Sequence, residues 1–102
     1  MTRMEAILKA REGRTLARMD GAAAELRRAA NDCGVRVMFF GSYARRAVHD
    51  RSDLDVLVLK GAPAEATDDF RERAELAGSK HDVFIDLRKE ERLPHLREGC
   101  VS

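Results

Sequence analysis

The sequence lacks most features that mark a secreted, membrane-spanning or disulfide-linked protein. Its 102 residues include two cysteines, Cys33 and Cys100, which lie far apart and lack a metal-ligand spacing. We therefore interpret both as free thiols in a reducing compartment. No signal peptide begins the sequence, and no apolar run approaches the ~18 residues that a membrane span requires. These absences predict a cytoplasmic protein.

An excess of charge of one sign is also lacking. Lysine and arginine number 19 against 18 acidic residues, which gives a net charge of +1. This balance gives no support to a broad nucleic-acid-binding surface. The sequence contains no internal repeat, low-complexity tract or linker, and its length corresponds to one domain. Apolar residues make up 44% of the chain, so we expect a globular fold with a core.

A long helix is predicted over residues 2–33. Its apolar residues recur at steps of three and four and form one stripe: Leu16, Met19, Ala23, Leu26, Ala30 and Cys33. Gly13 and Gly21 leave open a bend, with Asp20 as the cap of a second helix. Gly34 suits the C-terminal end of the segment.

Three segments are predicted to be strands, at residues 35–40, 54–59 and 81–87. Between the second and third we expect a helix over residues 67–77, which Gly78 would end. A final amphipathic turn or helix is expected over residues 89–98. This order of helices and strands predicts an α/β (α+β) domain of two or three layers with a small sheet.

The second predicted strand carries two carboxylates in an otherwise apolar segment. Asp53 and Asp55 are two residues apart, so their side chains leave a strand on the same face. Two adjacent carboxylates near a core are costly unless a positive charge neutralises them, and hard oxygen ligands favour magnesium. The alternative is that Asp53 belongs to a turn while Asp55 faces solvent.

Gly41-Ser42 directly follows the first predicted strand and precedes a short polar segment. Glycine allows a phosphate to approach the backbone, and Ser42 can cap a helix whose free N–H groups face an anion. A plain strand-to-helix turn is the other interpretation. Together with the aspartate pair, this segment predicts a triphosphate and metal site suited to in-line attack at phosphorus.

A metal site of this kind also needs a carboxylate from another strand. The third predicted strand offers two, Asp82 and Asp86, and the residues alone leave the choice open.

The stretch FFGSYARRAVHDRSDLDVLVL, residues 39–59, resembles the minimal nucleotidyltransferases of the DNA polymerase β superfamily. It has the pattern Gly-Ser, ten residues, Asp-x-Asp, and the similarity extends over about residues 33–101. The resemblance implies a single nucleotidyltransferase domain, residues 1–102, with a mixed sheet of three to four strands. The helix of residues 2–33 would be an extension of a catalytic core at residues 34–102.

The resemblance also implies roles for single residues. Gly41, Ser42 and Arg45 would bind the nucleotide, while Asp53 and Asp55 would hold two magnesium ions. The stretch Gly78-Ser79-Lys80-His81-Asp82 fits the family's approach to its third aspartate, so Asp82 is expected as the third ligand and catalytic residue, with Asp86 as the alternative.

Chains of this size resemble the antitoxins of two-gene modules whose partners are HEPN-domain toxins. The expected reaction is transfer of AMP from ATP to a tyrosine of the toxin, in a hetero-oligomer or a transient complex. Two other functions stay open: a non-catalytic antitoxin that acts by complex formation, and a catalytic subunit that modifies a small molecule or RNA with a partner's help.

Overall fold

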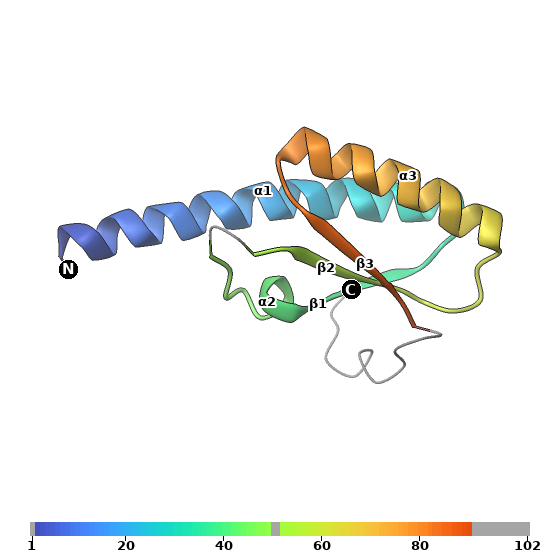
Figure 1. Cartoon of the computed structure of the whole chain (residues 1–102), viewed down its shortest axis with the longest axis horizontal. Coiled ribbons are helices and arrows are strands. Elements are labelled where there is room, and N and C mark those ends of the chain that lie inside the picture. Colours follow the sequence, from blue (N-terminus) through green and yellow to red (C-terminus); the bar gives the residue numbers. More distant parts are fainter. Residues whose placement is uncertain (1, 50–51, 91–102) are drawn as a thin grey trace.

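The computed structural model describes residues 2–49 and 52–90, which form a two-layer α/β domain. The elements are, in chain order, α1 (Arg3–Cys33), β1 (Val37–Phe40), α2 (Gly41–Ala44), β2 (Leu54–Val58), α3 (Ala64–His81) and β3 (Ile85–Lys89). The two long helices, α1 and α3, lie together on one side of the sheet (Figure 1). The element expected over residues 89–98 lies almost entirely outside the described residues.

The sheet has the strand order β1-β2-β3 and is mixed, as predicted. β1 pairs with β2 in antiparallel fashion and β3 pairs with β2 in parallel fashion. Phe40 at the end of β1 is opposite Asp55 on β2. Asp55 is in turn opposite Asp86 on β3. This register places the end of β1 and the first residues of β2 and β3 side by side.

α1 is a single helix of 31 residues that passes through both Gly13 and Gly21. Its start is fixed by a capping box, in which the Thr2 side chain accepts from the Glu5 N–H and the Glu5 side chain accepts from the Thr2 N–H. Gly34 ends it in the left-handed conformation, with φ of 75°. The predicted extent is therefore confirmed, whereas Asp20 lies inside the helix and caps nothing.

The predicted third strand is present, but its predicted start at residue 81 is wrong, because α3 continues to His81 and β3 begins only at Ile85. Gly78 does not end the helix as expected. It lies inside α3, where an added Cβ would be 2.8 Å from the Val83 carbonyl oxygen. A glycine at this position therefore lets the chain that leads to β3 cross closely over the helix.

The core lies between the two helices and the sheet. The predicted stripe of α1 faces it: Met19, Ala23, Leu26 and Ala30 are buried, and Leu16 and Cys33 are partly buried. The small alanines of α1 and α3 allow the two helices to approach closely. The largest side chains that are fully buried are Phe39, Phe70, Met19, Leu26, Leu54, Leu57 and Val56.

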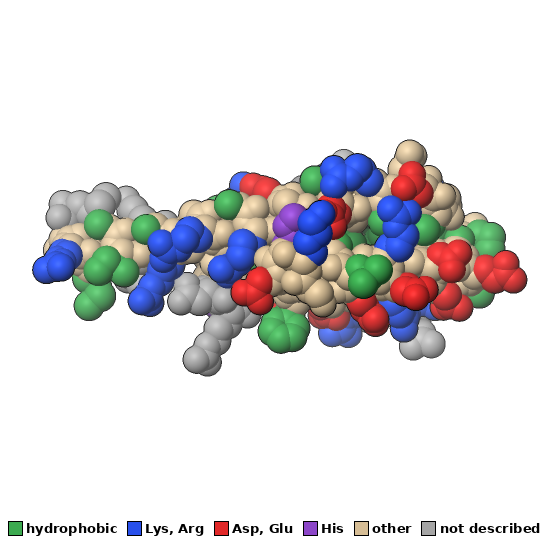
Figure 2. All heavy atoms as spheres, turned by 90° about the horizontal axis from the view of Figure 1, so that it is seen from above, with side chains coloured by type: hydrophobic (Ala, Val, Ile, Leu, Met, Phe, Trp, Pro, Cys, Tyr) green, Lys and Arg blue, Asp and Glu red, His purple; other side chains and the backbone are tan. Residues whose placement is uncertain are grey.

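The N-terminal part of α1 projects beyond the sheet (Figure 1), and its described side chains are exposed as far as Arg14. Seen from above, basic side chains gather on this projection, while acidic side chains gather over the first half of α3 (Figure 2). The near-zero net charge thus hides an uneven distribution. None of the described helices has the length and apolar character needed to cross a bilayer.

Truncation of Phe70 to alanine should lower the free energy of unfolding by about 3–5 kcal/mol, because its fully buried ring fills the space between α3 and the sheet. Leu76→Ala is a matched control on the same helix, because that side chain is 68% exposed. We expect it to change the free energy by less than about 0.5 kcal/mol. Urea unfolding of both variants measures the difference, and equal losses would contradict this core.

Candidate functional site

Three carboxylates lie at neighbouring positions on β2 and β3. Asp53 directly precedes β2, and Asp55 lies two residues later, so both side chains leave the sheet on the same face. Asp86 is beside Asp55 in the parallel register. The buried side chains of Leu54 and Val56 face the core, so the carboxylates lie on the opposite face, away from α1 and α3. We refer to Asp53, Asp55 and Asp86 as the carboxylate cluster.

Asp55 is the most constrained member of the cluster. Its partial burial raises the pKa of its carboxyl above the ordinary value, because a charge that leaves water loses hydration. The nearby carboxylates of Asp86 and Asp53 raise this pKa further by repulsion. The cluster therefore holds more negative charge than its surroundings neutralise, which is the condition in which a bound cation stabilises a site.

Gly41 lies against the Asp55 carboxylate. It has a positive φ of 71° and follows Phe40, which is opposite Asp55 in the sheet. A methyl group at this position would overlap the carboxylate oxygen and would lie 3.0 Å from the Asp55 carbon Cγ. Only a residue without a side chain fits both the backbone conformation and the space. The sequence-predicted Gly41 and Asp55 are thus brought together.

The expectation that Asp82 lies on the third strand beside this pair is wrong. Asp82 is the C-cap of α3, in the left-handed conformation with φ of 55°, and is exposed. It precedes β3 by three residues, because α3 extends further than predicted. The alternative, Asp86, is the one that the register brings beside Asp55.

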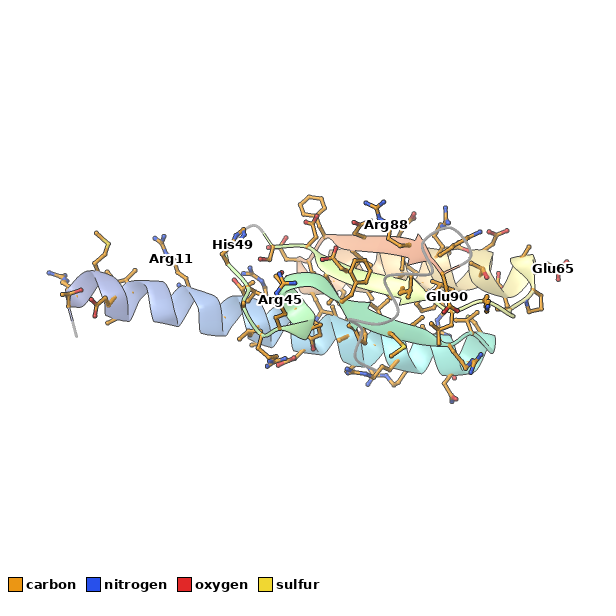
Figure 3. The ribbon with its side chains drawn as sticks, turned by 90° about the horizontal axis from the view of Figure 1, so that it is seen from below. Arg11, Arg45, His49, Glu65, Arg88 and Glu90 are labelled. Atoms are coloured by element: carbon orange, nitrogen blue, oxygen red, sulfur yellow. The ribbon has the colours of Figure 1, made fainter. Side chains whose placement is uncertain are left out.

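Two arginines lie on either side of the cluster. Arg88 on β3 donates to both oxygens of Asp86, from Nε at 3.1 Å and from Nη2 at 3.2 Å. Arg45 directly follows α2, and its charge opposes the rise in the pKa of Asp55, as does that of Arg88. In Figure 3 the two arginines lie on opposite sides of β2. The analysis of the sequence named Arg45 but missed Arg88, although its spacing of two from Asp86 indicates a shared strand face.

α2 is fixed to α1 through Asp20, another residue whose role the sequence did not reveal. The buried Tyr43 donates its hydroxyl to Asp20 at 2.5 Å, and Arg46 donates to both Asp20 oxygens at 2.8 and 3.1 Å. Arg46 keeps the pKa of Asp20 below its usual range. The guanidinium of Arg46 also lies 5.4 Å from the centre of the Tyr43 ring. This network sets where Gly41 and Ser42 stand relative to the sheet.

Ser42 is partly buried in α2, and its carbonyl oxygen accepts from the Ala47 N–H at 2.9 Å. Further along, the Ser52 hydroxyl accepts from the His49 N–H at 2.9 Å. Hydrogen bonds to backbone groups therefore hold the segment between Ser42 and Asp53 both near Ser42 and near Ser52.

The donor atoms of the cluster fit a hard divalent cation, because all are carboxylate oxygens and the single ion pair of Arg88 with Asp86 leaves the cluster with a net negative charge. Within residues 2–49 and 52–90, however, no three His, Cys, Asp or Glu side chains are arranged as a ready ligand set. The guanidinium of Arg88 already holds both oxygens of Asp86. A cation shared by Asp55 and Asp86 would use the lone pairs that Arg88 leaves open or would displace its guanidinium.

Gly41→Ala should destabilise the fold by about 2–4 kcal/mol, through backbone strain and the overlap with Asp55. Gly34→Ala is the matched control: its φ of 75° imposes similar strain, but no atom lies within 4 Å of the added Cβ. We expect it to cost about 1–2 kcal/mol. Equal urea midpoints for Gly41→Ala and Gly34→Ala would show that the added Cβ at position 41 does not collide with the Asp55 carboxylate.

Asp55→Asn should raise the stability of the cation-free chain by roughly 0.5–1 kcal/mol near neutral pH. The raised pKa of Asp55 means that its ionised form destabilises the folded state at pH values above that pKa. The gain should therefore shrink as the pH falls and the wild-type carboxyl becomes protonated. Thermal unfolding across the acid range measures it. Asp53→Asn, at an exposed position, should give a smaller gain, and a gain that grows toward acid pH would contradict the assignment.

Comparison with known proteins gives a family for the chain. Searches among curated proteins and among solved structures give no match. The sequence model of the nucleotidyltransferase domain matches residues 20–97, a span that begins at Asp20 and includes Gly41, Ser42 and the carboxylate cluster. This span is most of the chain, and its fold is the mixed sheet with flanking helices described above. The chain therefore belongs to the nucleotidyltransferase domain family.

Proposed function

We propose that the chain is a magnesium-dependent nucleotidyltransferase that transfers AMP from ATP to a hydroxyl group of a partner protein. The observation that carries the proposal is the register of the sheet, which places Asp55 beside Asp86 on one side and against the backbone of Gly41 on the other. A nucleotidyl donor needs such a combination, with open backbone for phosphates next to carboxylates for their counterions.

Asp53, Asp55 and Asp86 would hold the divalent cations, with Asp86 in the role first expected for Asp82. When bound, the cations neutralise the triphosphate and favour in-line attack at its α-phosphorus. Release of Arg88 from Asp86 would free a guanidinium at the edge of the cluster, where it can pair with phosphate oxygens. Arg45 and the backbone at Gly41-Ser42 would contact the triphosphate from the other side of β2.

In the proposed reaction the acceptor hydroxyl oxygen forms a bond to the α-phosphorus of ATP, and the bond from that phosphorus to the bridging oxygen breaks. Pyrophosphate leaves with the electron pair, and the hydroxyl proton passes to a carboxylate of the cluster. The product is an AMP ester of the acceptor.

The acceptor that we propose is a tyrosine of a helical HEPN-domain toxin, which makes the chain a cytoplasmic antitoxin. The resemblance of residues 39–59 to minimal nucleotidyltransferases supports this choice. The chain's own single tyrosine is a poor acceptor, because Tyr43 is 5% exposed and its hydroxyl donates to Asp20.

The chain, magnesium and its neighbouring gene product should be incubated with ATP labelled at the α-phosphate, and in parallel with ATP labelled at the γ-phosphate. We expect only the α-label to appear on tyrosine of the partner. Label from the γ-phosphate would indicate a kinase, and no label on a folded partner would contradict protein adenylylation.

Asp86→Asn should reduce this labelling roughly 100-fold or more, since it removes a group that acts on the charge of the reacting phosphate. Asp82→Asn is the matched control and should leave labelling unchanged, because Asp82 caps α3 outside the cluster. The reverse result would return the third carboxylate to Asp82. Circular dichroism confirms that both variants are folded.

A second candidate function is neutralisation by binding alone. The projecting part of α1 favours it, because Met4 is 68% exposed and Ile7 is 45% exposed on a helix that the rest of the described chain does not cover there. Asp55→Asn separates the two functions: a variant that still binds and still neutralises its partner would favour simple binding, whereas binding without neutralisation would favour catalysis.

A further inference from the structure

β3 lies at the edge of the sheet, and within the described residues it pairs only with β2. The Leu54 N–H donates to the Phe84 carbonyl at 2.8 Å, and the Glu90 N–H donates to the Val58 carbonyl at 2.9 Å. These bonds lie at the two ends of a parallel ladder, in which alternate residues of a strand turn their backbone groups toward the neighbour. Residues 84, 86, 88 and 90 therefore face β2. Ile85, Leu87 and Lys89 turn their N–H and C=O groups outward.

A hollow with a volume of about 570 Å³ borders this outward edge, between α3 and β3. Leu87, Ile85 and Ala74 are among its lining residues, and Arg71 and Glu75 of α3 are on its rim. Phe84, at the start of the edge, is 83% exposed. An edge strand whose outward backbone groups have no partner among the described residues, and which lies beside a hollow, is a suitable surface for another strand.

The charge pattern of β3 is complementary to itself. When two copies of β3 run antiparallel about a two-fold axis at Leu87, Leu87 is opposite Leu87 and Ile85 is opposite Lys89. Asp86 of each copy is then opposite Arg88 of the other, and cross-strand pairs of opposite charge are favourable. Axes at Asp86 or at Arg88 would place like charges opposite each other. The charge pattern of β3 thus favours a two-fold axis at Leu87.

A two-fold axis at Leu87 is also compatible with the outward backbone groups of β3 and with the position of α3. Because Leu87 turns its backbone outward, the central pair can exchange two hydrogen bonds, and each pair of Ile85 with Lys89 can do the same. α3 and its copy would run antiparallel beside the seam. Arg71 and Glu75, one helical turn apart on the rim of the hollow, would then offer opposite charges across it.

We propose that two copies of this chain associate through the outward edge of β3, antiparallel and centred on Leu87, so that Arg88 of each copy lies beside Asp86 of the other. The two three-stranded sheets become one sheet of six strands. Both carboxylate clusters open on the same face of this sheet, and each Asp86 gains a second arginine. The association does not depend on the proposed function.

The mass of the full chain in solution tests the proposal, by sedimentation or light scattering across micromolar concentrations. We expect a dimer, and a chain that is monomeric throughout would overturn the proposal. Leu87→Lys should weaken the dimer about 100-fold or more, because it sets two like charges at the axis. Leu76→Lys is the matched control on α3: that side chain is 68% exposed and lines a separate hollow, so the dimer should persist.

A charge exchange tests the register and needs no activity. Arg88→Asp sets carboxylates opposite each other and should give monomers. The double variant Asp86→Arg/Arg88→Asp restores opposite charges across the seam and should restore the dimer. This variant also covers the case in which Leu87→Lys fails to fold, which circular dichroism would show. A dimer that survives Arg88→Asp or Leu87→Lys in folded protein would place the interface elsewhere and overturn the proposal.

Discussion

Asp55 carries its charge between two other carboxylates, against the backbone of Gly41 and partly out of water. An ordinary structural role would not require such a position, because removal of the charge would make the folded chain more stable. Arg88 supplies partial compensation by holding Asp86. Gly41, the left-handed turn after β1 and the pairing of β2 with both neighbours are all needed to keep this carboxylate where it is. The site therefore destabilises the folded chain, and the packing of the core must offset this loss.

That stability comes from the opposite face of the sheet. The helices α1 and α3 bury the other side of β2, so the same five-residue strand has a core face and a site face. The Asp20 network extends this support to α2, since Tyr43 packs in the core and its hydroxyl reaches back to α1. The position of Gly41 and Ser42 therefore depends on the hydrogen bonds that connect α2 to α1. A change in Asp20 would therefore act on the site from a residue that does not line it.

Much of this arrangement could be predicted from local patterns. The two-residue spacing of Asp53 and Asp55, the stripe on α1 and the spacing from Gly41 to Asp55 all depend on period and short-range chemistry. The third carboxylate could not be predicted in the same way, because Gly78 has two opposite uses: it can end a helix or allow a close crossing. The Val83 N–H donates to the Gly78 carbonyl at 2.9 Å and closes a helix that runs on to His81. β3 therefore begins four residues later than predicted, and Asp86 rather than Asp82 lies beside Asp55. Asp20 was missed for a different reason, since its partners lie more than twenty residues away.

The two halves of α1 differ in what protects their backbone. From Thr15 onward the helix buries side chains against the core, so its amide hydrogens exchange with solvent only when the domain opens. Before Thr15 the described side chains are exposed, and local helix formation with the Thr2–Glu5 capping box carries the stability. Amide hydrogens in the first turns of this one helix should therefore exchange by local opening, whereas those after Thr15 should exchange only when the domain unfolds. An uncomplexed chain would keep its sheet and core while the first turns of α1 melt and re-form independently.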